Sequence, residues 1–242
     1  MRWFSTCTVV ALAVLIGAGA LLAFLIVLFA GPPGLLDLDL EQREALWMDA
    51  GLSLFFFIQH SGMIRKSFRR WITRCIPKDY ERASYAIASG TALLVVIVCW
   101  QETPLLFQPP GVIFRSFLRA VYWLSLLGFV WGIISLKIFD PCGVRPLVVR
   151  SRGGIQKRMS FVSRGAYLWV RHPLYLFMLL MIWSYPALQP DRLLFNVLWT
   201  VWIVIGAILE ERDLLEEFGE TYREYQRRVP MFIPWRLKTT SR

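Results

Sequence analysis

Residues able to bind a polar molecule are concentrated in the last third of the chain, in two groups separated by an apolar stretch. The first group is the motif Arg171-His172-Pro173-Leu174-Tyr175. The second group contains Glu210-Glu211, Phe218-Gly219, Tyr222, Tyr225 and Arg228-Val229-Pro230. Because ionisable and aromatic residues are costly at a membrane boundary unless they bind something, we expect both groups to form one binding site.

The first motif has the pattern of a helix that begins at a membrane surface. His172 and Tyr175 are three residues apart and would share one face of that helix. Pro173 suits the first turn, where a missing N–H costs little. A binding role predicts that this face meets a ligand, but a simple interfacial anchor would have the same composition.

The second group offers acceptors, aromatic rings and a cation. Adjacent helical residues point about 100° apart, so either Glu210 or Glu211 can face inward and accept hydrogen bonds from ribose hydroxyls. Tyr222 and Tyr225 share a face suited to packing on an adenine-like ring. Arg228 could donate a forked pair of hydrogen bonds to a carboxylate. The alternative for these residues is an amphipathic, solvated helix lying on the bilayer.

Composition predicts the fold that positions these residues, which is an all-α polytopic transmembrane helical bundle. Of 242 residues, 56% are hydrophobic, and they occur in long runs. About 20 apolar residues cross a bilayer as a helix. We expect six spans at Thr6–Ala30, Leu46–Met63, Ala83–Trp100, Phe117–Phe139, Leu174–Leu188 and Leu193–Leu209. The last two form a helical hairpin, and an amphipathic tail helix follows at 210–228.

The whole chain, 1–242, is predicted to form a single integral membrane domain. Residues 1–45 would supply an accessory first span and an outside loop, 46–140 the bundle core, and 141–242 the binding hairpin and tail. The stretch Ser151–Ser163, with two glycines and three bases, is the segment most typical of a mobile loop.

The charge distribution predicts the orientation. A net charge of +10 could indicate nucleic-acid binding, but in a membrane protein it reflects basic cytoplasmic loops. The loops 65–82 and 137–171 are strongly basic, whereas 31–45 is acidic. We therefore expect both termini in the cytoplasm and no nucleic-acid partner. The scattered cysteines and the two histidines predict neither a disulfide framework nor a metal site.

At these motifs the chain resembles a known group of membrane enzymes. The C-terminal third resembles the isoprenylcysteine carboxyl methyltransferase-like superfamily in Arg-His-Pro-x-Tyr, followed after a hairpin by Glu-Glu, Tyr-x-x-Tyr and Arg-Val-Pro. Further motifs look like its bacterial methanethiol S-methyltransferase branch: Gln59-His60-Ser61, the basic stretch Arg65–Arg74, Pro77, Glu81-Arg82-Ala83-Ser84-Tyr85, Phe139-Asp140 and Tyr185-Pro186. The resemblance covers roughly residues 45–235.

The resemblance implies methyl transfer from S-adenosyl-L-methionine to a small thiol, most simply methanethiol, in a bacterial inner membrane. It places around the cofactor His172, Pro173, Tyr175, Glu210, Glu211, Tyr222, Tyr225 and Arg228, with Arg228 also at the reacting centre. His60 is the free candidate for a general base that forms the thiolate. Its alternative role is a hydrogen bond between helices.

Two departures from the family pattern bear on the acceptor. Phe177 stands where the superfamily usually has glycine, and Lys137-Ile138 where it usually has Asn-His. The second hypothesis is that the chain methylates a larger lipophilic acceptor, either prenylated or aromatic. The third is a non-catalytic membrane protein of the nitric-oxide-associated type, although the complete set of motif residues favours an enzyme.

Overall fold

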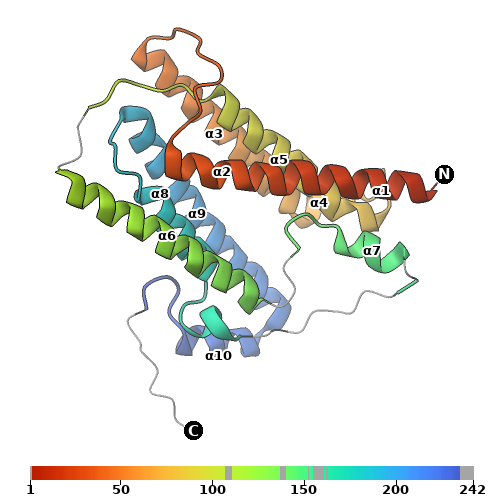
Figure 1. Cartoon of the computed structure of the whole chain (residues 1–242). Coiled ribbons are helices and arrows are strands. Elements are labelled where there is room, and N and C mark those ends of the chain that lie inside the picture. Colours follow the sequence, from red (N-terminus) through yellow and green to blue (C-terminus); the bar gives the residue numbers. More distant parts are fainter. Residues whose placement is uncertain are drawn as a thin grey trace. The chain divides into compact units, whose positions relative to one another are not determined.

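The computed structural model describes residues 2–106, 111–136, 140–151, 153–154, 161 and 163–234, and within them every regular element is a helix (Figure 1). Contacts divide the chain into two compact units. The first unit comprises Met1–Gln108, Asp140–Arg158 and Leu188–Leu198. The second comprises Pro109–Phe139, Met159–Ala187 and Trp199–Arg242. The single-domain organisation over 1–242 stays a prediction.

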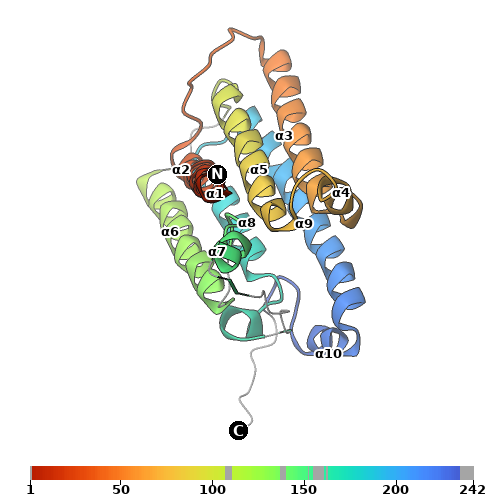
Figure 2. The same cartoon turned by 90° about the vertical axis from the view of Figure 1, so that its right-hand side faces the viewer.

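The first unit is built on three long helical segments. Consecutive elements α1 (Arg2–Leu12), η1 (Ala13–Ala18, a π-helical turn) and α2 (Gly19–Ala30) form the first segment. The others are α3 (Gln42–Ile64) and α5 (Glu81–Cys99), which lie side by side (Figure 2). The first segment packs on α5 at a glycine: a Cβ on Gly90 would lie 2.8 Å from the Ile16 carbonyl oxygen. Small residues permit this close packing between apolar helices.

Short elements complete the first unit near the ends of α3 and α5. They are α4 (Lys66–Ile72), η2 (Lys78–Tyr80) and α7 (Arg145–Ser151). A capping box between Glu41 and Glu44 starts α3 by satisfying otherwise unpaired backbone N–H groups.

A buried group of side chains, the first polar cluster, fixes one end of this unit. It consists of Asp49, Gln101, Thr103 and Asp191. Asp49 Oδ1 accepts the Gln101 backbone N–H at 3.0 Å. Asp191 accepts the Thr103 backbone N–H at 3.2 Å and Trp100 Nε1–H at 3.1 Å. The cluster therefore holds the chain that leaves α5 against two helices.

The second unit contains α6 (Gly111–Ser135), η3 (Gly165–Leu168), α8 (Pro173–Trp183), most of α9 (Pro190–Phe218) and α10 (Glu220–Arg228). Helices α6 and α8 pack side by side (Figures 1 and 2). Phe177 lies against Gly128 and Leu174 against Gly132, so that a Cβ at either glycine would overlap the facing side chain. The bulk of Phe177, unexpected from the family pattern, is therefore accommodated by a glycine on the neighbouring helix.

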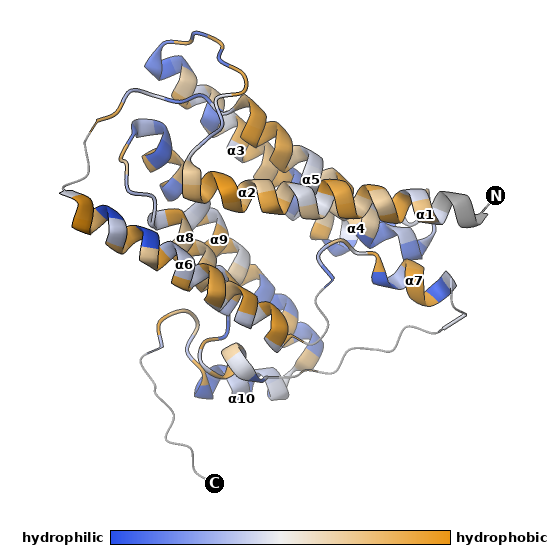
Figure 3. Ribbon diagram, in the orientation of Figure 1, coloured by the Kyte–Doolittle hydropathy of each residue, from blue (hydrophilic) through white to orange (hydrophobic). Residues whose placement is uncertain are grey.

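Each of the six predicted apolar segments falls largely within a helix. In the described part of the chain, four helices are long and apolar enough to cross a membrane: Thr6–Ala30, Lys78–Cys99, Gly111–Ser135 and Pro190–Phe218. Figure 3 shows apolar residues along most of α2 and α6, whereas α10 is largely hydrophilic. The protein is thus all-helical with four candidate spans, and six spans stay a prediction.

The two remaining segments differ from the prediction for separate reasons. Helix α3 is long enough to span but contains Asp49, Gln59 and His60, which lower its hydropathy. Helix α8 has 11 residues and ends at Trp183, well before the predicted Leu188. At 1.5 Å per residue it is about 16 Å long, shorter than a hydrocarbon core of about 30 Å. The residue before Pro186 is disfavoured in a helix, which explains the early end.

The predicted tail helix also differs from the structure. No breaker follows Leu209, so α9 continues to Phe218. Gly219, with φ of 56°, ends it in a conformation that favours glycine, and α10 begins at Glu220. Phe139, the predicted end of the fourth span, lies outside the described residues, as does most of the loop predicted to be mobile.

Candidate functional site

The two motif groups meet in the second unit at the N-terminus of α8. Pro173 is the first residue of this helix and is buried, and His172 precedes it as the N-cap residue. The backbone N–H of Arg171 donates to the Pro230 carbonyl at 2.8 Å, and that of His172 donates to the Met231 carbonyl at 3.2 Å. Main-chain hydrogen bonds thus join the Arg-His-Pro motif to the end of the Arg-Val-Pro motif.

The Arg171 side chain strengthens this junction. Its Nε donates to Glu211 Oε1 at 2.6 Å and its Nη2 to Glu211 Oε2 at 3.1 Å, a bidentate pair. Its Nη1 donates to the carbonyls of Gln226 and Val229 at 3.1 and 2.7 Å. A cation at the C-terminal carbonyls of α10 also has the favourable sign for the helix dipole. One side chain therefore connects α8, α9 and α10.

Glu211 is saturated by its neighbours. Besides Arg171, it accepts a hydrogen bond from His172 Nε2–H at 3.1 Å and from Gln226 Nε2–H at 2.8 Å. We call Arg171, His172, Glu211 and Gln226 the second polar cluster. Because both carboxylate oxygens already have donors, Glu211 is suited to holding the helices together.

Glu210 has a different environment, although it is the adjacent residue. The Tyr175 hydroxyl donates to its Oε2 at 2.8 Å, and its side chain is 46% exposed. The Tyr175 ring stacks on the His172 ring with centroids 5.5 Å apart. The sequence predicted that one of these two adjacent carboxylates faces inward and the other faces solvent. In the structure, Glu211 faces inward and Glu210 is exposed.

Tyr222 and Tyr225 share the buried face of α10, as their spacing predicts. They pack with Val229, and partly buried Phe161 and Phe218 cover them. Burial raises the pKa of both phenols, which keeps them neutral. The Tyr225 hydroxyl donates to the Tyr167 carbonyl at 2.6 Å. In this arrangement the two rings form the core beneath the second polar cluster.

The end of α6 positions the segment that leads into α8. Arg164 Nε donates to the Ser135 carbonyl at 2.7 Å, at the last turn of α6. The Ser135 hydroxyl accepts the Ala166 backbone N–H at 3.0 Å. Gly165, with φ of 54°, lies so close to Ser135 that a side chain there would clash. These contacts set the approach of the chain to Arg171.

Arg228 is not brought into this group within the second unit, and His60 belongs to the other unit. Arg228 is 66% exposed, and its guanidinium pairs with Glu224 one helical turn earlier at 3.0 Å. His60 belongs to α3 in the first unit, where its imidazole lies within hydrogen-bond distance of the Tyr85 hydroxyl, 2.8 Å from Nε2. The other predicted site residues all belong to the second unit.

Sequence reasoning included Arg171 in the first motif without giving it a role of its own, and it did not single out Gln226. Arg171 stands at the start of the first motif, next to His172, but the composition of that motif is equally typical of an interfacial anchor. Gln226 lies four residues after Tyr222 and therefore on a neighbouring part of the same helix face. That spacing was the available signal for placing it near Glu211.

Comparisons with known proteins give consistent relatives. A methanethiol S-methyltransferase from Pseudomonas sp. is 39% identical over 207 residues, covering 82% of this chain and 76% of the relative. One from Mycobacterium tuberculosis is 34% identical over 184 residues, covering 74% of each protein. Nurim from Rattus norvegicus is 28% identical over 200 residues, covering 78% of this chain and 75% of the relative.

No family model and no solved structure matches the chain. The identity and coverage shared with the bacterial enzymes are nevertheless sufficient to assign it. The chain belongs to the methanethiol S-methyltransferase family.

Proposed function

We propose that this chain is an S-adenosyl-L-methionine-dependent thiol methyltransferase that converts methanethiol to dimethyl sulfide. Its relatives bear the name of that activity. The structural observation that supports the proposal most strongly is the junction at α8, where main-chain and charged contacts join the two motif groups. The location proposed for this activity is a bacterial inner membrane with both termini in the cytoplasm.

The accessible end of the second polar cluster fits the polar parts of the methyl donor. Glu210 has an exposed carboxylate able to accept hydrogen bonds from ribose hydroxyls or an ammonium group. Tyr175 would hold Glu210 in place and His172 would support the Tyr175 ring. We therefore assign ligand contact to Glu210, and assign to Glu211 the support of His172 and Arg171.

The remaining predicted contacts stay predictions. Stacking of an adenine-like ring on Tyr222 or Tyr225 would require a ring to leave its present contacts with Phe161. Binding of a carboxylate by Arg228 would require its guanidinium to leave Glu224. We propose that the two tyrosines support the site mainly by packing beneath Arg171 and Glu211.

When bound, S-adenosyl-L-methionine supplies an activated methyl group, and its transfer to methanethiol yields dimethyl sulfide, S-adenosylhomocysteine and one proton. The chain must bind both substrates, orient them and exclude water. It must also favour the thiolate, because the thiolate is the nucleophile. We propose His60 as the group that accepts the thiol proton, with Tyr85 holding the imidazole.

The direct test supplies membranes containing the protein with S-adenosyl-L-methionine and methanethiol, and measures dimethyl sulfide in the headspace. We expect product that depends on both substrates. His60→Ala should lower kcat and remove the low-pH limb of the rate profile, whereas Tyr85→Phe should retain the limb because it keeps the imidazole.

Other outcomes separate the parts of the proposal. Binding of the methyl donor without dimethyl sulfide would contradict methanethiol as acceptor and favour a larger lipophilic one. Failure to bind the donor would contradict the methyltransferase function. Full activity in His60→Ala would remove only the proposed base.

A further inference from the structure

Asp49, on α3, is a buried carboxyl group with an incomplete set of hydrogen-bond partners. Its side chain is fully buried. Its Oδ1 accepts the Gln101 backbone N–H at 3.0 Å, whereas its Oδ2 has no hydrogen-bond partner within the described residues. Asp191 differs, because both of its oxygens accept hydrogen bonds, one from Thr103 and the other from Trp100. Since hydrogen bonds stabilise the charged form of a carboxyl group, Asp191 is much better suited to a negative charge than Asp49.

The charges around the first polar cluster disfavour a second anion there. Asp49 and Asp191 bind backbone N–H groups two residues apart on the chain, so the two donor nitrogens are at most about 7 Å apart. The carboxylate of the intervening residue, Glu102, also repels that of Asp191. Among the buried residues that the structure describes, Arg192 is the only arginine or lysine, and its Nη2 donates to the Leu28 carbonyl at 3.4 Å. One buried cation offsets only one of the two buried carboxylates.

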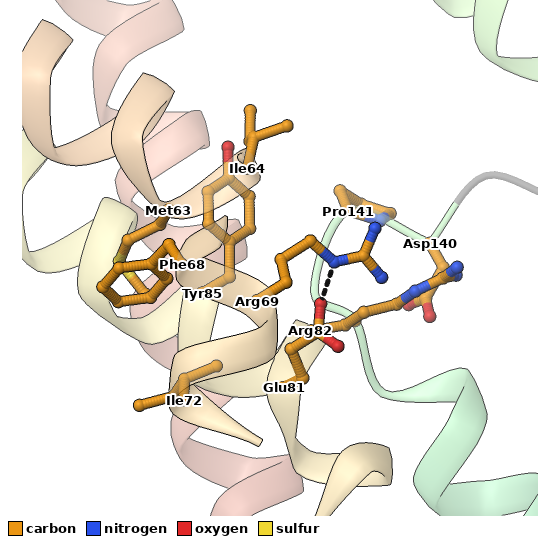
Figure 4. Close-up of a pocket in the computed structure, with 11 residues that line it drawn as sticks. Met63, Ile64, Phe68, Arg69, Ile72, Glu81, Arg82, Tyr85, Asp140 and Pro141 are labelled. Atoms are coloured by element: carbon orange, nitrogen blue, oxygen red, sulfur yellow. Dashed lines mark hydrogen bonds and ion pairs between the residues drawn. The ribbon is translucent and has the colours of Figure 1, made fainter. Parts of the chain in front are cut away.

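Other carboxylates of the first unit pair directly with arginines. Glu81 forms an ion pair with Arg69 at the edge of the cavity shown in Figure 4, and Asp79 forms one with Arg150. In the described part of the chain, no basic side chain forms an ion pair with Asp49, whose printed partner is a neutral backbone N–H. Asp49 therefore combines complete burial with the absence of a neutralising cation.

The contact between Asp49 and Gln101 also leads to the loop that precedes α3. Gln101 Nε2 donates to the Leu36 carbonyl at 2.8 Å and to the Cys99 carbonyl at 2.8 Å. Gln101 Oε1 accepts the Leu38 backbone N–H at 3.1 Å. The backbone of Gln101 is thus held by Asp49 and its side chain holds the loop, so a change at Asp49 that moves Gln101 reaches residues 36–38.

An unpaired carboxylate is costly to bury, and one neutral N–H donor does not offset the loss of its hydration. A carboxylic acid in the same place carries no charge, and its proton occupies the oxygen that lacks a donor. We propose that Asp49 is a proton-binding site, in which Oδ2 carries a proton in the folded protein at neutral pH. Deprotonation draws water to this group and opens its contact with Gln101. None of these residues takes part in the proposed methyl transfer.

Proton binding at Asp49 sets the direction in which stability changes with pH. An aspartate in an unfolded chain has a pKa of about 3.9. Above that pH, and until Asp49 also ionises in the folded protein, the folded state holds one more proton than the unfolded state. Stability therefore decreases as pH rises through this window, and the decrease ends once the folded protein has lost the same proton.

The test follows thermal unfolding of the purified full-length protein in detergent between about pH 5 and pH 9. Wild type is compared with Asp49→Asn, which keeps the shape of a protonated carboxyl group but cannot ionise. We expect wild type to lose melting temperature relative to this variant by up to about 3–5 °C per pH unit, equivalent to a tenfold change in the folding equilibrium constant. Groups that both proteins share cancel in the difference.

Asp191→Asn is the matched control, because it makes the same exchange at the other buried carboxyl group. It should be less stable than wild type across the whole range and should still lose stability as pH rises. A constant difference between wild type and Asp49→Asn at every pH would overturn the proton-binding site, as would a difference that favours wild type as pH rises.

Hydrogen exchange at residues 31–41 of wild type gives a second measurement that does not depend on the folding of a variant. After correction for the intrinsic effect of pH on exchange, we expect the Leu38 amide to lose protection at high pH, because its acceptor is Gln101. Amides of α6 in the same sample serve as the reference. Protection at Leu38 that does not change with pH would contradict the opening of the contact.

Discussion

The first polar cluster joins the start of α9 to the chain that leaves α5, whereas the second joins the later part of α9 to the start of α8. The two clusters differ in which of their side chains remain accessible to solvent. In the first polar cluster all four members, Asp49, Gln101, Thr103 and Asp191, are buried, and backbone N–H groups provide several of the donors. The second polar cluster contains a bidentate ion pair and continues into Glu210, which is exposed.

We propose that this difference separates a structural role from a binding role within one chain. Buried polar groups need partners wherever they occur, so the hydrogen bonds of the first cluster, in which Asp49 Oδ2 has no partner within the described residues, alone say nothing of function. The Glu210 carboxylate accepts one hydrogen bond from Tyr175 and lies beside a saturated network, yet it is still open to solvent and therefore has capacity for a ligand. We infer binding at the second cluster and structural support at the first.

The largest effect is expected from breaking the second polar cluster at Arg171. Arg171→Met would leave Glu211 without its bidentate partner and remove two hydrogen bonds to the end of α10. Breaking a partly buried pair of this kind costs about 3–5 kcal/mol. Thermal unfolding of the purified protein should show a large decrease in melting temperature. An unchanged melting temperature would contradict the role given to Arg171.

The second-largest effect is expected from changing the packing of α8 against α6, since His172 and Tyr175 lie at the start of α8. Gly128→Ala places a methyl group where the Phe177 ring lies, and overpacking of this kind costs about 1–3 kcal/mol. Phe177→Leu in the same protein should recover part of the loss. Melting temperatures of both single variants and the double variant measure the coupling; simple additivity would refute the contact.

A change in the first polar cluster should lower stability without a specific effect on ligand binding. Asp191→Asn exchanges a charged acceptor for an amide beside Thr103 and Trp100, at a cost of about 1–2 kcal/mol. Melting temperature should fall, while the folded fraction binds the methyl donor as wild type does. A selective loss of donor binding would contradict the contrast between the clusters.

The smallest effect is expected at Arg228. Its exposed pair with Glu224 is screened by solvent and contributes about 0.5 kcal/mol at most. Arg223→Ala is a matched control, because Arg223 forms a similar exposed pair with Glu220 on the same helix. Equal, near-wild-type donor binding by both variants would exclude Arg228 from the site. A loss confined to Arg228→Ala would restore the role that the motif implies.

The sequence predicted much of the second unit because helical periodicity fixes which residues share a face. The pairs His172 with Tyr175 and Tyr222 with Tyr225 followed from spacing alone, as did the different directions of Glu210 and Glu211. Periodicity does not show where the chain goes after a helix ends. The return of 230–231 to the backbone of 171–172 therefore could not be predicted, nor could the pairing of Glu211 with Arg171.

The most direct test of the central claim is calorimetric binding of S-adenosylhomocysteine to the purified wild-type protein, Glu210→Gln and Glu217→Gln. Glu217 is an exposed carboxylate on the same helix and serves as the control. Our account predicts that wild type and Glu217→Gln bind equally, and that Glu210→Gln binds about tenfold more weakly at an unchanged melting temperature. Equal binding by all three proteins, or no binding by wild type, would contradict it.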